Sequence, residues 1–158
     1  MRRRGCHLHH ALRGALAGAA GTTALNAVTY LDMALRARPA SSSPEQTVRQ
    51  AERHTRPLPG DESSAGNRRS GIGALLGIAA GVTSGVLYGC ARTWCPRTPV
   101  PLLAIGAGLA ANAGSTAPMT ALGVTDPREW TAESWLMDLV PHLAFGAVTA
   151  LAYEGFRR

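Results

Sequence analysis

The sequence contains no lysine, and all sixteen of its basic residues are arginine. Aromatic residues are also few, with three Trp, three Tyr and two Phe in 158 residues. Nucleic-acid-binding surfaces need basic patches interleaved with aromatic side chains. We therefore expect no nucleic-acid partner, and the exclusive use of arginine beside so much alanine and glycine is typical of a GC-rich genome.

The sequence also lacks catalytic motifs. It has no Walker loop, no nucleotide-binding glycine motif and no nucleophile elbow, and no Ser or Cys nucleophile is followed by a base at a fixed spacing. We therefore predict a protein that is not an enzyme and needs no cofactor.

Cysteine is scarce as well, and a metal site built on it is not expected. Thiols and imidazoles are ligands for zinc or copper(I), but their spacing here matches no standard metal motif. An uneven number of cysteines in a reducing compartment usually means free thiols. The residues concerned are Cys6, His7, His9, His10, Cys90 and Cys95.

Charge is missing from long segments of the chain. Residues 14–31, 70–91 and 98–124 contain no charged residue, and residues 135–156 are apolar except for Asp138, His142 and Glu154. About 20 apolar residues in a helix cross a hydrocarbon core of about 30 Å. The helices of a soluble bundle would show polar stripes, and the second and third segments show none. The sequence therefore predicts an all-α membrane protein, a bundle of four transmembrane helices.

The predicted organisation alternates spans and loops. In chain order we expect a flexible basic N-terminus (1–10), a first span (11–35), a polar loop (36–70) with a short surface helix at about 44–54, a second span (71–91), a short loop (92–98), a third span (99–123), a loop (124–133) and a fourth span (134–156).

Local signals refine two of these boundaries. Ser43 as N-cap, Pro44 at the first helical position and Gln46 as the partner in a capping box predict the start of the surface helix. Thr131 is placed to cap the last span.

Aromatic residues predict where the spans meet the membrane surface. Trp130 and Trp135 mark one interface, and Trp94, Tyr88 and Tyr153 mark the other, as in an aromatic belt.

Arginine placement indicates the orientation. An even number of spans puts both termini on one side, and the arginines at 2–4, 92, 97, 157 and 158 lie close to the ends of spans. The loop at 36–70 dilutes its seven arginines with acidic residues. By the positive-inside rule, we expect a multi-pass protein of the plasma (inner) membrane with both termini in the cytoplasm.

The second predicted span carries a ridge of glycines at every fourth position: Gly73, Gly77, Gly81, Gly85 and Gly89. Lipid supplies no hydrophobic drive between helices, so small residues at this spacing favour association by close backbone contact. The ridge predicts a helix-packing surface. Packing within the chain is favoured three to one, and a homo-oligomer or a contact with another membrane protein is the alternative.

A second regularity suggests a repeat. The strings AGTTALNAV (20–28) and AGSTAPMTA (113–121) resemble each other, and the second and fourth spans also align, with Gly81 on Gly146. Two tandem helical hairpins would explain this, as in some transporters. Chance matches between alanine-rich strings are the alternative.

Ionisable side chains inside spans are costly and often functional. Asp138 and His142 are four residues apart and so share one helix face, where they are able to share a proton or a hydrogen bond. Ser115 and Thr116 would extend a polar seam. In a purely structural interpretation, Asp138 caps its helix or pairs with an arginine, and Glu154 pairs with Arg92 or Arg157. The candidate polar site comprises Asn26, Asp32, Asn112, Asp138, His142 and Glu154.

Three long segments together carry a resemblance: AGTTALNAVTYLDMALRARPASSSPEQTV, PGDESSAGNRRSGIGALLGIAAGVTSGVLYG and LGVTDPREWTAESWLMDLVPHLAFGAVTALAYE. They resemble a group of small actinobacterial multi-span membrane proteins of unknown function, over residues 14–154. The resemblance implies a membrane location and carries over no catalytic residue. We expect a non-enzymatic helical bundle with a structural or assembly role in the lipid bilayer. A transporter or channel component using Asp138 and His142 is the alternative.

Overall fold

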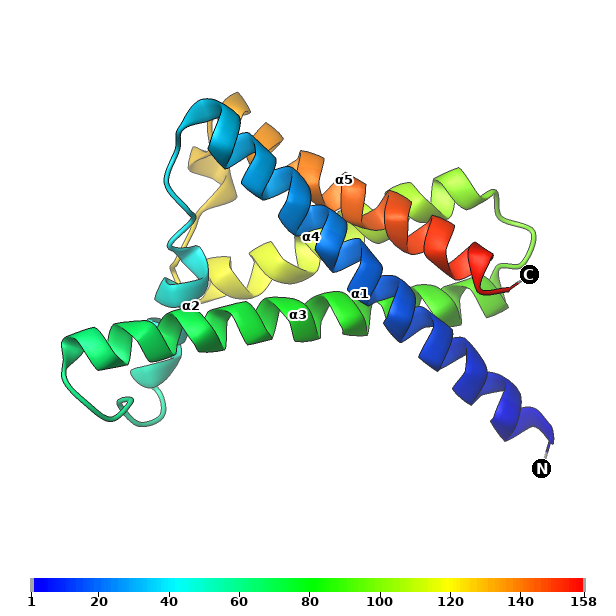
Figure 1. Ribbon diagram of the computed structural model, residues 1–158, viewed down its shortest axis with the longest axis horizontal. Helices are drawn as coiled ribbons and strands as arrows, with labels where there is room; N and C mark the ends of the chain where they lie inside the picture. The colour runs from blue at the N-terminus through cyan, green and yellow to red at the C-terminus, as the bar shows by residue number, and fades with distance from the viewer. Residues whose placement is uncertain (1, 158) are drawn as a thin grey trace.

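The computed structural model describes residues 2–157, with side chains from residue 8 onward (Figure 1). All regular secondary structure of the described chain is helical, without a strand. Its elements are α1 (Arg2–Arg36), α2 (Ser43–Glu52), α3 (Glu62–Trp94), α4 (Val100–Ala121), the 3-10 helix η1 (Pro127–Glu129) and α5 (Ala132–Gly155). With five α-helices, the protein is a helical bundle but not simply a four-helix bundle.

The long helices alternate in direction. Helix α1 packs against both α3 and α5, α4 packs mainly against α5, and α2 lies on α3. Both termini and the α3–α4 connection lie at one end of the molecule, and the connections that follow α1 and α4 lie at the other (Figure 1). We call these the terminal end and the loop end.

Three helices, α3, α4 and α5, are long and apolar enough to cross a membrane. Helix α1 is not among the helices of the described chain that meet this condition. Its uncharged segment consists mostly of Ala, Gly and Thr, which are less apolar than Leu, Ile and Val. A fourth span through α1 stays a prediction.

Two boundaries differ from those expected. Helix α1 begins at Arg2, so the backbone at 2–10 is helical and continuous with the segment expected as the first span, and the flexibility expected there stays a prediction. Helix α3 begins at Glu62, inside the segment expected to be a loop, because the Asp61 side chain accepts a 2.8 Å hydrogen bond from the Ser64 amide and caps the helix.

The two predicted caps have different outcomes. Thr131 caps α5 by accepting a 3.1 Å bond from the Ser134 amide, which confirms that prediction. Ser42, one residue earlier than predicted, is the N-cap of α2, and its side chain makes no capping bond to the backbone. The predicted capping box at Ser43 is therefore wrong, because the Gln46 amide donates to the Ser42 hydroxyl at 2.7 Å instead.

Helix α2 is fastened to the first turns of α3. Val48 is buried beneath it, and Arg69 donates to Glu52 at 2.7 Å and to Glu62 at 2.8 Å. The hydrogen bond from Arg69, with one from the Leu58 amide, holds the pKa of Glu52 below its ordinary value. At neutral pH the short helix is thus held on α3 by apolar contact and by charge.

Glycines set the distance between α1 and α3. A Cβ atom on Gly18 would lie 2.5 Å from the carbonyl oxygen of Gly81, and one on Gly14 would lie 2.5 Å from that of Gly85. A Cβ atom on Gly89 would lie 2.6 Å from the carbonyl oxygen of His10. No residue with a side chain fits at these places without moving the backbone.

Two other helices of the chain, α1 and α2, pack on the glycine ridge of α3. Gly81, Gly85 and Gly89 face α1, whereas Gly73 faces Pro44 of α2, whose Cβ would be 2.9 Å from a Cβ at that glycine. Gly77 has open space around its Cβ position. Most of the ridge is therefore occupied within the chain and is not open to a second copy.

Glycines also bring the other helices together. A Cβ on Gly108 of α4 would lie 2.7 Å from the His142 carbonyl oxygen of α5, and Gly146 faces back onto Gly108. Between α1 and α5, a Cβ on Gly21 would lie 2.8 Å from the Phe145 carbonyl oxygen.

The buried core is small and lies where α1, α3 and α5 meet. Tyr88 and Tyr153 are buried there in an edge-to-face contact, with ring centroids 5.4 Å apart. Their assignment to an aromatic belt is therefore wrong, because both rings are buried among the helices and do not lie on the outer surface of the bundle. Trp94, in contrast, is exposed.

Large apolar side chains lie mainly on the outside. Leu75 of α3, Leu102 of α4 and Leu151 of α5 are 65%, 60% and 69% exposed. A water-soluble bundle of this size would bury such residues. An apolar exterior around a small, glycine-rich interior fits a lipid environment.

We predict that Gly85→Leu lowers the free energy of unfolding in mild detergent by at least about 2 kcal/mol, because the new side chain would overlap the α1 backbone. Gly77→Leu, on the same ridge but facing open space, is the matched control and should leave it nearly unchanged. Denaturation followed by circular dichroism measures both. Equal losses in the two variants would contradict the α1–α3 contact.

Candidate functional site

A polar cluster lies between α4 and α5. It consists of Asn112 and Ser115 on α4 and Asp138 and His142 on α5. The crossing of Gly108 over His142 brings the two backbones together. Since the helices run in opposite directions (Figure 1), the turn after Gly108 on α4 faces the turn before His142 on α5. This register places Asn112 opposite Asp138.

The cluster is joined by short hydrogen bonds. The Asn112 amide donates to the Asp138 carboxylate, and His142 Nδ1 lies 2.7 Å from the Asp138 carbonyl oxygen. The Ser115 hydroxyl donates to the Asn112 carbonyl oxygen at 2.9 Å and lies 3.3 Å from His142 Nε2. His142 Nδ1 is also 3.7 Å from the Asp138 carboxylate.

These side chains are largely shielded by the two helices. Asn112 is buried, and the side chains of His142 and Asp138 are 12% and 26% exposed. In a low-dielectric surrounding, a polar group without a partner is expensive. The mutual bonding of these four groups removes most of that cost and leaves a site able to hold a proton.

The other predicted site residues lie elsewhere. Asp32 is bonded to Arg38 and lies 3.8 Å from Arg36, at the loop end. Arg36 in turn binds Glu133 at the start of α5. Asp32 is thus part of a charge cluster that ties the end of α1 to α5, outside the polar cluster.

Glu154 lies at the terminal end and accepts a 2.6 Å bond from Arg92 and a 3.0 Å bond from Arg157. These are the partners that the structural interpretation gives it. Asn26 is half-buried on α1, and no hydrogen bond joins it to the described side chains of the polar cluster. Of the six predicted residues, the structure therefore brings together Asn112, Asp138 and His142.

Two features of the site were not among the predicted site residues. Ser115 was expected only as an extension of a polar seam, and the Gly108–Gly146 crossing was not predicted. Spacing in the sequence is the signal that points to Ser115 and to Gly108. Gly108, Asn112 and Ser115 lie three or four residues apart and therefore share one face of α4.

The metal hypothesis concerns residues at the terminal end. The side chains of Cys6 and His7 lie outside the described residues. His10 Nδ1 lies 2.6 Å from the Tyr153 hydroxyl. Cys90 and Cys95 are free thiols, and no group of three metal-binding side chains occurs among the residues whose side chains are described.

The two proposed hairpins cross in different registers. In the sequence alignment Gly81 corresponds to Gly146 and Thr22 to Ser115. Gly81 contacts Thr22, but Gly146 contacts Gly108, and Ser115 contacts His142. The partner of Gly146 is displaced along α4 by seven residues and that of Ser115 along α5 by four, which is about one to two helical turns, and the tandem repeat stays a prediction.

Comparison with known proteins adds no assignment. No family model, no curated protein and no solved structure matches the chain.

Two shallow surface hollows on the described part of the chain lie away from the polar cluster. One is lined by residues of α2 and its N-cap and includes Glu45 and Arg49, and the other lies at the terminal end beside Val100 and Glu154. Neither hollow is lined by a member of the polar cluster.

We predict that Asn112 and Asp138 stabilise the bundle as a pair. A double-mutant cycle of Asn112→Ala and Asp138→Ala should give a coupling of about 1 kcal/mol in the free energy of unfolding in mixed micelles. The control cycle pairs Asp138→Ala with Asn26→Ala, which should be additive because these residues share no hydrogen bond. Additivity in both cycles would contradict the α4–α5 register.

Proposed function

We propose that the protein is a multi-pass integral protein of the plasma membrane with a non-enzymatic structural or assembly role. Its similarity to small actinobacterial membrane proteins is part of the same proposal. The support is physical: the apolar side chains face outward, and the ionisable groups within the helices, Asp32, Asp138 and Glu154, are bonded inside the chain.

One observation carries the assembly role. Residues 74–80 of α3, with the sequence ALLGIAA, are exposed at every position. Seven successive residues cover about two turns and therefore all faces of a helix. No other described element of this chain covers this apolar segment, which suits contact with a helix of another membrane protein or of a second copy.

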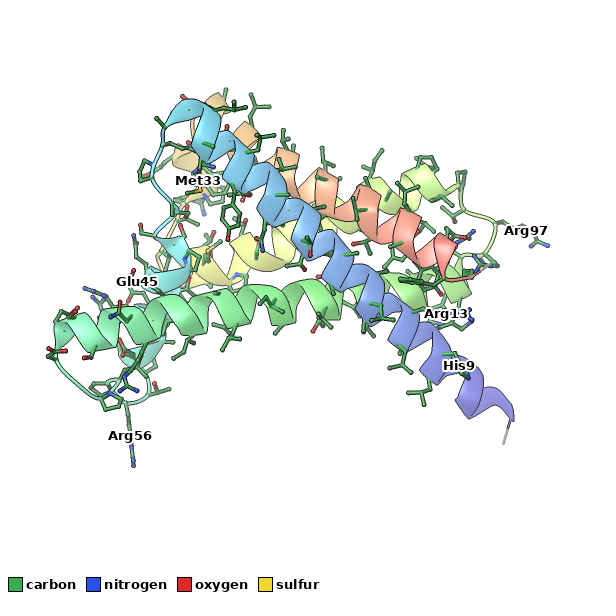
Figure 2. The ribbon with its side chains drawn as sticks, viewed as in Figure 1. His9, Arg13, Met33, Glu45, Arg56 and Arg97 are labelled. Atoms are coloured by element: carbon green, nitrogen blue, oxygen red, sulfur yellow. The ribbon has the colours of Figure 1, made fainter. Side chains whose placement is uncertain are left out.

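Charge supports an orientation with both termini in the cytoplasm. Residues 1–13, 92–97 and 154–158 contain eight arginines and one acidic residue, and the described part of these segments lies at the terminal end. The other eight arginines share their segments with nine acidic residues. The side chains of Arg97 and Arg56 point away from the bundle at the terminal and loop ends respectively (Figure 2). The strongly positive end suits the anionic cytoplasmic leaflet.

We predict that a membrane-impermeant thiol reagent, applied to intact cells, modifies a cysteine at Ser64 and not one at Thr98, in a chain otherwise free of cysteine. Ser64 belongs to the loop end and Thr98 to the α3–α4 connection. Permeabilised cells, in which both should react, are the control. The reverse pattern would overturn the orientation.

The assembly role predicts a defined protein neighbour at residues 74–80. A photoreactive amino acid at Ile78 should give one discrete cross-linked protein product in the native membrane. The same group at Leu102, an exposed residue of α4, should give chiefly lipid adducts. A product of twice the mass of the chain indicates a second copy, and a different discrete mass indicates another protein. Lipid adducts alone at Ile78 would count against assembly.

A transporter or channel component is the second candidate, favoured by the meeting of Asn112, Asp138 and His142 inside the bundle. It requires proton-linked flux in proteoliposomes that disappears in Asp138→Asn. The structural role requires that the wild-type protein and Asp138→Asn give no more flux than vesicles without protein.

A further inference from the structure

The hydrogen bonds of His142 define the state of one ring nitrogen. Nδ1 lies 2.7 Å from the carbonyl oxygen of Asp138. A carbonyl oxygen only accepts, so Nδ1 must carry a proton and donate it. The Asn112 side-chain amide nitrogen, 3.4 Å from Nδ1, is also a donor, and one of its two protons is donated to the Asp138 carboxylate. Nδ1 therefore stays protonated whatever the charge of the ring.

The other ring nitrogen faces a hydroxyl with two possible acceptors. Ser115 Oγ lies 3.3 Å from His142 Nε2 and 2.9 Å from the Asn112 carbonyl oxygen. A hydroxyl has one proton to donate and is able to accept at the same time. The direction of the Ser115 O–H bond thus depends on whether Nε2 carries a proton.

Both charge states of the ring are satisfied by the same positions of the heavy atoms. When the ring is neutral, the Ser115 hydroxyl donates to Nε2. When the ring is charged, Nε2 donates to Ser115 Oγ, and the hydroxyl turns to donate to the Asn112 carbonyl oxygen. Binding a proton requires only rotation of this hydroxyl, a movement that helix packing does not oppose.

The charge of a protonated ring is balanced locally. The Asp138 carboxylate lies 3.7 Å from Nδ1 and carries the opposite charge. Helix α4 has no charged residue, and α3 has none from residue 70 to 91. The charged groups that α1 brings toward this end of α5, Asp32, Arg36 and Arg38, are paired with one another and with Glu133.

We propose that Asn112, Ser115, Asp138 and His142 form a proton-binding site inside the bundle, in which His142 Nε2 takes up the proton and Ser115 positions it. The site goes beyond the structural role proposed above, and it holds whether or not a solute is transported. Asp138 is the fixed counter-charge, and Asn112 is the residue that keeps its carboxylate facing the ring.

The test is ¹⁵N NMR of the histidine-labelled protein in lipid nanodiscs between pH 5 and pH 9, with His142 assigned through Pro141 and Leu143. We expect Nδ1 to remain protonated over the whole range while Nε2 alone gains a proton on acidification. A neutral ring with its proton on Nε2, or a ring that does not change between these pH values, would overturn the proposal. The measurement needs no variant and no transported substrate, so its failure is distinct from failure of the assembly role.

Ser115→Ala tests the role of the hydroxyl. In the neutral ring, Nε2 loses its hydrogen-bond donor, while the bond from Nδ1 to the Asp138 carbonyl oxygen is untouched. The ¹⁵N resonance of Nε2 in the neutral ring should therefore move toward that of a nitrogen without a hydrogen bond, and the resonance of Nδ1 should stay in place. Ser134→Ala, in the first turn of α5 beside Thr131, is the matched control and should move neither resonance. An unchanged Nε2 resonance in Ser115→Ala would overturn the positioning role of Ser115.

Discussion

The rest of the structure depends on the close contact of two backbones, those of α1 and α3, where glycines of each helix meet. In a bilayer the tails around a helix are as apolar as its side chains, so burial of leucine offers little gain. Contact between backbones replaces it, since it brings many atoms within van der Waals range. Gly14 and Gly18 against Gly81 and Gly85 provide this contact. Because α1 also packs on α5 at Gly21, its position fixes those of both other helices.

The same environment explains how polar groups are arranged. Water is absent from the hydrocarbon core, so a charged or polar side chain must find its partner within the protein. At the two ends of the bundle the partners are arginines, which bind Asp32 and Glu154. Between α4 and α5 no arginine is present, and amide, hydroxyl and imidazole groups bind Asp138 instead. Because these partners carry no fixed positive charge, the negative charge of the Asp138 carboxylate is not cancelled as it would be by an arginine.

Much of this arrangement could be predicted from the sequence, because it depends on spacing along one helix. Four-residue intervals identified the ridge of α3 and the shared face of Asp138 and His142, and the uncharged runs identified α3, α4 and α5. Contacts between helices could not be predicted in the same way. They depend on where two helices cross, and a shift of about one turn exchanges every partner. The alignment of Gly81 with Gly146 therefore failed to give the partners of Gly146, and it gave no indication that Pro44 would cover Gly73.

The uncovered segment of α3 follows from these crossings. Helix α1 leaves α3 before Gly77, and the contacts of α2 with α3 extend only from the first turns of α3 to Gly73, which faces Pro44. The seven residues between these contacts, 74–80, extend over about 10 Å at 1.5 Å per residue. A helix with its side chains is about 10 Å in diameter, so the free length matches the width of one crossing helix. Gly77, at the middle of this length with no atom near its Cβ position, offers such a helix the close approach that its neighbours on the ridge offer α1.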